Sequence, residues 1–182
     1  CHLFCFIIIS YFIKKQNVPL KGTIVKHNKS KVENDTINPS MEKVLDGDAA
    51  FNTKDYKNAI KCYTDAISLD EDNMEAYSSL ALAYKKLGDQ THSISDYESS
   101  LQAVKACNAR MNKNKSLLHD PEIKAATYYN AGLAREEIAK LQIKANNIAG
   151  AIENYVKAKQ NFVTAYNNAE EAENAERMIL YK

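Results

Sequence analysis

Small and apolar residues recur along this chain at the spacing of amphipathic helices, and one pattern of them is repeated. The segment Ala-Ile-x-x-Tyr-x-x-Ala occupies residues 59–66 and again residues 151–158, and a blurred copy with serine in place of both alanines occupies residues 93–100. The first copy begins at Ala59 and the blurred copy at Ser93. A fixed period of this length indicates a unit that cannot bury its own apolar face and stacks on a neighbour. The pattern therefore predicts a stack of helix pairs.

Aromatic and small residues also precede each copy at matching positions. They are Gly47, Ala50 and Phe51 in the first unit, Tyr77, Leu80, Ala81 and Tyr84 in the second, and Tyr128, Ala131 and Gly132 in the third. Two helices approach closely only where a side chain is small, and we expect each tyrosine to fill the adjoining hole. With this spacing the chain resembles the tetratricopeptide repeat (TPR) family. The resemblance implies an all-α fold, an α-solenoid of about three helix-turn-helix units with a C-terminal capping helix.

One insertion separates the second unit from the third, and another enlarges the third unit. The distance in sequence from Tyr77 to Tyr128 exceeds one period by half a period, and Tyr128 is further from Tyr155 than Tyr77 is from Tyr97. The first insertion is polar and contains no Gly or Pro before Pro121, so we expect it to extend the second helix of the second unit. The second insertion, around residues 140–150, is expected to lengthen the third helix pair.

Capping residues divide the repeat region into helices. The predicted helix starts follow Asn38-Pro39, Asp55, Asp72-Asn73, Asp89 and Asp120-Pro121, because each supplies an N-cap oxygen or a first-turn proline. The predicted helices cover residues 40–52, 55–69, 73–87, 89–113, 121–145 and 148–161. A seventh amphipathic stretch begins at Phe162. Whether it is separate from the preceding helix stays open, since only Asn167 and Asn168 interrupt the pattern.

Residues 1–38 differ in composition from residues 39–182, which we assign to the TPR domain. Residues 1–32 contain six lysines and no acid, so the remaining 18 basic residues face 23 acids. An apolar run of about thirteen residues opens the chain and is shorter than the ~20 residues that span a bilayer. We expect a poorly ordered tail, interpreted as the end of a truncated membrane anchor, a damaged signal peptide, or translated sequence outside the coding region. Lys14 and Lys15 follow the apolar run, which favours repeats on the cytosolic side of any membrane held through residues 1–13.

No pattern of catalytic or cofactor-binding residues is present, so we predict neither an enzyme nor a cofactor. The sequence contains no G-x-S-x-G, H-E-x-x-H or GK[ST] motif and no Gly-rich dinucleotide turn. Cys1, His2 and Cys5 lack the second ligand pair of a structural zinc site, and the spacing of the four cysteines suggests no disulfide framework. The densest basic run of the repeat region carries no interleaved aromatics, so RNA binding is the weaker alternative and we predict no nucleic-acid partner.

The resemblance to the TPR family implies a concave groove formed by the first helix of each unit. The residues that it places in this groove are Asp48, Phe51 and Asn52 in the first unit, Ser79, Leu82, Lys85 and Lys86 in the second, and Tyr129, Asn130, Leu133 and Glu137 in the third. A mixed polar and apolar groove suits an extended peptide or a partner helix.

One TPR subgroup grips the C-terminal carboxylate of cytosolic heat-shock chaperones with five residues, among them lysines and an arginine. The corresponding positions of this chain hold Val44, Asp48, Ser79, Ala126 and Asn130. No cation is available there to pair with a carboxylate, and Asp48 repels it. We therefore expect no chaperone-tail clamp.

These observations together predict a cytoplasmic protein–protein interaction module, an adaptor or scaffold that binds a protein or peptide of unknown identity. Two alternatives stay open. In the first alternative, the chain is a fragment of a membrane-anchored TPR receptor or co-chaperone that captures client peptides. In the second, it is the accessory domain of a larger enzyme.

Overall fold

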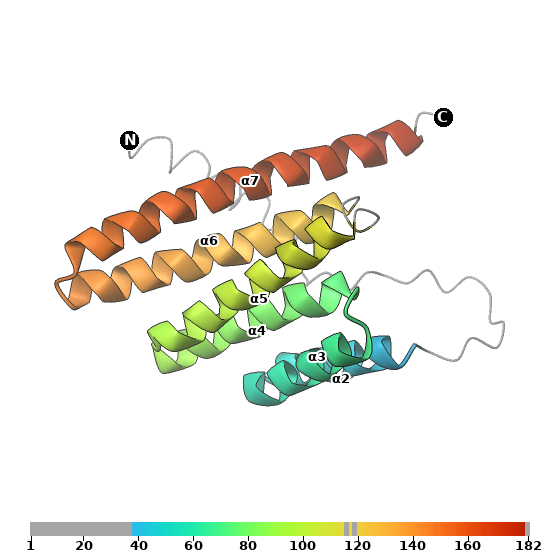
Figure 1. Ribbon diagram of the computed structural model, residues 1–182, viewed down its shortest axis with the longest axis horizontal. Helices are drawn as coiled ribbons and strands as arrows, with labels where there is room; N and C mark the ends of the chain where they lie inside the picture. Colours follow the sequence, from blue (N-terminus) through green and yellow to red (C-terminus); the bar gives the residue numbers. More distant parts are fainter. Residues whose placement is uncertain (1–37, 115–116, 118–119, 181–182) are drawn as a thin grey trace. The chain divides into compact units, whose positions relative to one another are not determined.

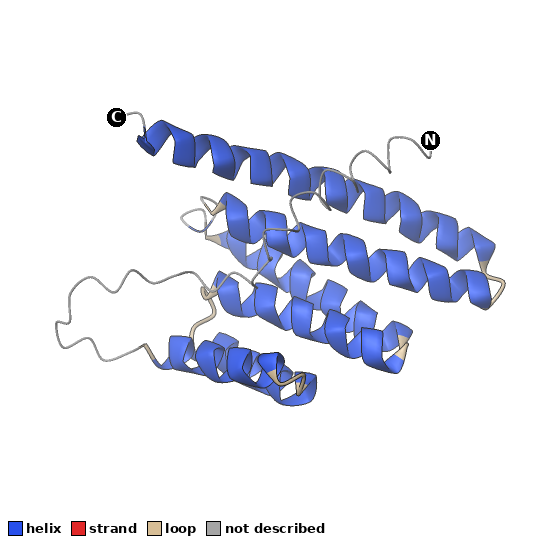
Figure 2. Cartoon of the chain, turned by 180° about the vertical axis from the view of Figure 1, so that it is seen from behind, coloured by secondary structure: helices blue, strands red, loops and turns tan. Residues whose placement is uncertain are grey.

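The computed structural model describes residues 38–114, 117 and 120–180, the last seven of these by their backbone alone. In the described residues all helices are α-helices apart from a single 3₁₀ position at Leu117, and there is no strand (Figure 2). The helices are α2 (Pro39–Asn52), α3 (Tyr56–Leu69), α4 (Met74–Thr91), α5 (Ile94–Lys113), α6 (Pro121–Lys144) and α7 (Ile148–Leu180). The predicted all-α class is confirmed.

Three helix pairs follow one another along the chain. The pairs α2–α3, α4–α5 and α6–α7 each pack closely, α3 also packs on α4, and α5 packs on α6 (Figure 1). The first helices of successive pairs also meet, α2 with α4 and α4 with α6. This is the order of contacts of a helical repeat solenoid with three helix-turn-helix units, as the sequence predicts.

The predicted tail lies outside the described residues except for Asn38. The candidate anchor at residues 1–13 and the division of the chain at residue 38 therefore stay predictions. None of the described helices is long and apolar enough to cross a membrane.

Most of the predicted helix starts are confirmed by hydrogen bonds. The side chains of Asn38, Asp55, Asn73 and Asp120 each accept a backbone N–H two or three residues ahead, at 2.9, 3.2, 3.0 and 2.9 Å. Pro39 and Pro121 occupy the first turns of α2 and α6, where a missing N–H costs nothing. Local capping chemistry thus sets where these helices begin.

The predicted helix start at Asp89 is wrong. α4 continues to Thr91 and is followed by His92 in the left-handed conformation, with φ 53°, and α5 begins after Ser93. Asp89 remains helical because its carboxylate has partners on the helix surface: Lys85 lies 2.8 Å away and the Tyr97 hydroxyl donates to it at 3.1 Å. An ion pair within α4 and a hydrogen bond from α5 therefore outweigh the capping preference of this aspartate.

The first and third pairs share the same turn. Lys54 and Asn146 both have positive φ, and the next residue in each case, Asp55 or Asn147, accepts a backbone N–H three residues on. The first alanine of each Ala-Ile-x-x-Tyr-x-x-Ala segment lies at the same distance in sequence from its capping residue. The enlarged third pair is therefore a genuine repeat unit with longer helices.

A glycine of each first helix lies under an aromatic ring of the second helix. The pairs are Gly47 with Tyr63, Gly88 with Tyr97, and Gly132 with Phe162, and a Cβ on these glycines would lie 2.5, 2.8 and 2.5 Å from a ring carbon. The separation of glycine and ring along the chain differs from pair to pair by multiples of seven. Seven residues correspond to about two helical turns, which is one turn in each helix of the pair. Adding one full turn to each helix brings the same faces back into contact, so pairs of different length make the same glycine-to-ring contact.

The expectation that each repeated tyrosine fills a hole is correct for Tyr63 and wrong for Tyr155. Tyr63 is buried, whereas Tyr155 is 39% exposed and Ile152 is 60% exposed. Counted back from the turn, the position of Gly47 is occupied in the third unit by Ala139, whose Cβ keeps a ring off the helix backbone. Phe162 takes this role seven residues further on.

α7 is one continuous helix through Phe162, which answers the question that the sequence leaves open. Asn168 does not interrupt it, because its side-chain amide donates to the Thr164 carbonyl at 2.8 Å. The terminal segment therefore continues the second helix of the third unit. The expected helix end at residue 161 is wrong, and the expected C-terminal capping helix is the distal part of α7 rather than a separate helix.

Candidate interaction surface

The predicted site residues lie on the first helices α2, α4 and α6. We call this set the first-helix surface: Asp48, Phe51, Asn52, Ser79, Leu82, Lys85, Lys86, Tyr129, Asn130, Leu133 and Glu137. All of them are at least partly exposed except Asn130, which is 7% exposed. Because α4 contacts both α2 and α6, the three rows of residues are carried by helices that touch one another. The structure thus places these residues on neighbouring helices.

Asp48 is the centre of a polar cluster at the α2 end of this surface. The Tyr63 hydroxyl donates to Asp48 Oδ1 at 2.7 Å. Burial raises the pKa of Asp48, and the hydrogen bond from Tyr63 opposes this shift. Burial and the neighbouring carboxylate raise the pKa of Tyr63 well above its usual range, while Ser79 of α4 acts in the opposite direction. Asp48 is therefore primarily an acceptor for Tyr63, and it joins α2 to α3.

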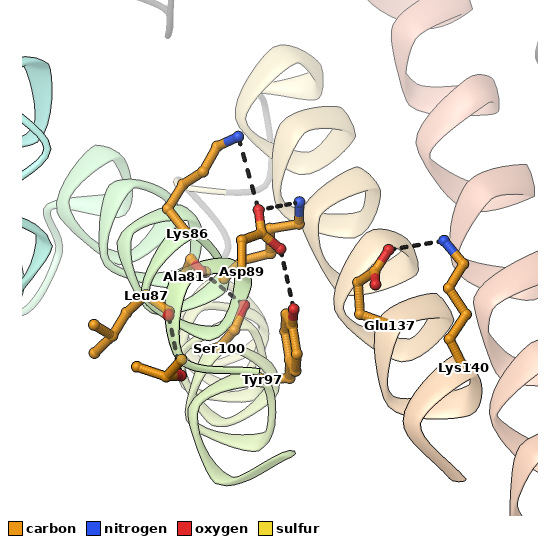
Figure 3. Close-up of polar contacts among 10 residues, drawn as sticks. Ala81, Lys86, Leu87, Asp89, Tyr97, Ser100, Glu137 and Lys140 are labelled. Atoms are coloured by element: carbon orange, nitrogen blue, oxygen red, sulfur yellow. Dashed lines mark hydrogen bonds and ion pairs between the residues drawn. The ribbon is translucent and has the colours of Figure 1, made fainter. Parts of the chain in front are cut away.

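A second cluster lies on α4 and is built around Asp89, which the sequence analysis missed as a surface residue. The Nζ atom of Lys85 lies 2.8 Å from Asp89 Oδ2. The Nζ atom of Lys86 lies 3.9 Å from the same oxygen, and the Tyr97 hydroxyl donates to the other oxygen of Asp89 (Figure 3). Burial, followed by Asp89, raises the pKa of Tyr97 above its usual range. Asp89 was missed because its type and spacing indicated a helix cap.

The two lysines of α4 differ in how available they are. The side chain of Lys85 is 12% exposed and makes the shorter ion pair with Asp89. The side chain of Lys86 is 42% exposed and its ion pair is longer. Lys86 is therefore the cation of the second unit that is better placed to contact a ligand.

The α6 row is mainly apolar and acidic. The Tyr129 ring lies 5.7 Å from the Phe162 ring, centroid to centroid, at an interplanar angle of 57°. Glu137 is bound to Lys140 at 2.8 Å, and the Glu137 carboxylate also contributes to the raised pKa of Tyr97. Asn130 is enclosed within this row. Its burial makes it a packing residue as well as a candidate contact.

The five residues that the sequence analysis compares with a carboxylate clamp include no lysine or arginine. Val44 is 1% exposed and belongs to the core cluster of the first unit, Asp48 is bound by Tyr63, and Asn130 is enclosed. Asn52, Ser79 and Lys86 are polar residues of the first-helix surface that remain at least partly exposed.

Neither cysteine of the described residues is in a disulfide, and no cluster of three or more His, Cys, Asp or Glu side chains that could hold a metal is found there. Cys107 is fully buried against Met74, and burial raises the pKa of its thiol to about 11. Cys62 is partly exposed.

We expect a thiol reagent at pH 8 to modify Cys62 in the folded protein and to spare Cys107, because the thiolate is the reactive species and Cys107 is both protonated and enclosed. Peptide mapping by mass spectrometry after timed labelling measures this, and denaturant should bring the two rates together. Equal labelling of both thiols in native buffer contradicts the packing of α4 on α5.

Comparison with known families agrees with this architecture. The structure defines a helical repeat protein. Residues 47–88 match the model described as TPR repeat, and residues 75–103 match the model described as tetratricopeptide repeat. Residues 47–103 are therefore tetratricopeptide repeats, and the resemblance inferred from the sequence is confirmed. The α6–α7 pair lies outside the matched residues and is assigned to the same architecture by its turn and packing. No curated protein matches the chain.

Proposed function

We propose that this chain is a non-catalytic adaptor or scaffold that binds an extended peptide or a partner helix on the first-helix surface. Tetratricopeptide repeats are a protein-interaction fold, and this supports the general class. The observation that carries the proposal is the row of partly exposed residues on three touching helices, polar on α2 and α4 and more apolar on α6. Such a surface offers apolar side chains and hydrogen-bonding groups on neighbouring helices, which together form the proposed ligand track.

The proposed ligand is recognised along its length rather than by its C-terminal carboxylate. Lys86 is the exposed cation of the track, while Asp48 and Glu137 add negative charge at its two ends. An acidic or neutral residue of the ligand fits beside Lys86, and a free carboxylate finds no pair of cations. The proposed location is the cytosol, where a buried free thiol such as Cys107 persists.

Lys86→Glu is expected to weaken ligand binding about tenfold, or about 1.4 kcal/mol, because it reverses the charge at the middle of the track. The ligand is a peptide selected from a display library on the immobilised full chain, and the dissociation constant is measured by fluorescence anisotropy. Amidation of the peptide's C-terminus is expected to change binding little.

Lys61→Glu is the matched control, since it makes the same charge change at an exposed position of α3. Both variants should unfold at the wild-type midpoint. Equal binding by the wild type and Lys86→Glu contradicts the proposed surface. Asn130→Ala is less suitable as a test, because Asn130 is enclosed and its loss alters packing.

A further inference from the structure

α7 carries a second apolar face in addition to the one that packs on α6. Ala151, Ala158 and Ala165 are buried on the α6 side. The other face holds exposed apolar side chains spaced at helical intervals, which we call the α7 stripe: Ile148, Ile152, Tyr155, Val156, Val163 and Tyr166, each between 39% and 60% exposed. These positions lie on one side of the helix, with Lys159 in the middle of the stripe. A contiguous row of this kind indicates a contact surface.

The α3 residues that correspond to Ile152 and Tyr155 are both covered by neighbouring helices, and Tyr63 lies over Gly47 of α2. In the first copy of the repeated segment, Ile60 packs against the core cluster that includes Ala76 and Ala83 of α4. Ile152 holds the same place in the second copy and is exposed. The same sequence therefore builds a helix-binding face in both units, and in the third unit that face is open among the described residues.

We propose that the α7 stripe joins two copies of this chain, with their α7 helices antiparallel about a two-fold axis. A two-fold interface has to be complementary to itself. The stripe meets this condition because it is nearly symmetric about residue 157: Ile148 falls opposite Tyr166 of the second copy, Tyr155 falls opposite Lys159, and Ile152 falls within one residue of Val163. Apolar residues thus meet apolar residues along most of the stripe.

Charge favours the antiparallel direction. Lys159 of one copy meets the ring and hydroxyl of Tyr155 in the other, an arrangement that stabilises a cation. Glu170 and Glu171 of one copy are brought toward the α6–α7 turn of the other, where the exposed Lys144 ends α6. A parallel arrangement places Lys159 beside Lys159 and Glu170 beside Glu170, which repel each other.

This interface is independent of the proposed ligand track. The track lies on the first helices, whereas α7 is the second helix of its unit, so ligand binding and self-association are separable by mutation.

Sedimentation equilibrium of the full chain tests the association. We expect the apparent mass to rise with concentration from 20.5 kDa toward twice that value. Ile152→Glu should raise the dimer dissociation constant by about tenfold or more, because it buries a charge within the apolar contact. Thr164→Glu adds the same charge on the polar side of α7, outside the stripe, and should leave association unchanged. Helical circular dichroism confirms that each variant is folded.

Any one of three results overturns the proposal. The first is a wild type that stays at the monomer mass at every concentration, and the second is equal weakening of association by the two variants. The third is a monomeric full chain that becomes a dimer when residues 1–37 are removed. The last result assigns the stripe to a segment of the same chain instead of a second copy.

Disulfide trapping tests the antiparallel register, in a background with serine at Cys1, Cys5 and Cys62. A mixture of Ile152→Cys and Val163→Cys chains should form a cross-linked dimer under mild oxidation. Either variant alone should not, because like residues are then separated by about 11 residues of helix, or ~16 Å. Efficient cross-linking of Ile152→Cys alone indicates a parallel pair and contradicts the proposal.

Discussion

Replacing Tyr63 by alanine is expected to lower the free energy of unfolding by about 3–5 kcal/mol. Tyr63 is one of the largest fully enclosed side chains of the described residues, its ring lies over Gly47, and its hydroxyl is the partner of Asp48. The substitution leaves a cavity between α2 and α3 and an unpaired, half-buried carboxylate. Urea denaturation followed by circular dichroism measures the change.

Tyr63→Phe separates the two contributions, since it keeps the ring and removes the hydroxyl. Its expected cost is smaller, about 1–3 kcal/mol, from the partner that Asp48 loses. A change below about 1 kcal/mol for Tyr63→Ala would falsify the packing of the first unit, because loss of a buried ring costs more than that.

Phe162→Ala is expected to cost about 3 kcal/mol, near the lower end of the range for aromatic residues because the ring is partly exposed. Phe162 covers Gly132 and contacts the Tyr129 ring, so it contributes to the packing of α7 on α6. Thermal or urea unfolding at low chain concentration measures this without a contribution from association.

Tyr155→Ala is the comparison that decides between the sequence pattern and the structure. The repeated segment makes Tyr155 the equivalent of Tyr63, whereas the structure leaves it exposed on the α7 stripe. We expect Tyr155→Ala to change the free energy of unfolding by no more than about 0.5 kcal/mol. A larger loss for Tyr155→Ala than for Phe162→Ala contradicts the register of the third pair.

The sequence predicts the helices of this fold well because their starts depend on local chemistry. Asn38, Asp55, Asn73 and Asp120 cap helices through bonds within three residues of themselves, and such bonds follow from residue type and order. Asp89 has the same residue type but binds Lys85 and Tyr97 instead. Its role depends on where α5 lies against α4, which a single-residue preference does not encode.

Register within the helix pairs is the part that the sequence pattern does not determine. Gly88 and Tyr97 are closer in sequence than Gly47 and Tyr63 by about two helical turns, counted over both helices of the pair. Gly132 and Phe162 are further apart than Gly47 and Tyr63 by about four turns. A shift of this size keeps the same faces in contact, so the hydrophobic periodicity is equally satisfied before and after it. The placement of the rings is decided by which position lacks a Cβ, as the contrast between Ala139 and Gly132 shows.

The sequence predicts which helices carry the first-helix surface, but it predicts less well which single side chains are exposed on it. Lys86 and Asn52 are exposed as the sequence analysis requires. Lys85 is mostly enclosed by its ion pair, and Asn130 is buried. Both differences arise from contacts between side chains that are distant in sequence or on neighbouring turns, and these contacts are visible only once the helices are assembled.

Amide chemical-shift mapping is the measurement that tests the central claim most directly. A peptide selected on the full chain is titrated into isotope-labelled protein, and the shifted amides are assigned to helices. The proposal predicts shifts concentrated on α2, α4 and α6, around Asn52, Ser79 and Lys86, with little change along α3 and α5. Shifts confined to α3, α5 or α7, with the first-helix surface unchanged, would contradict it.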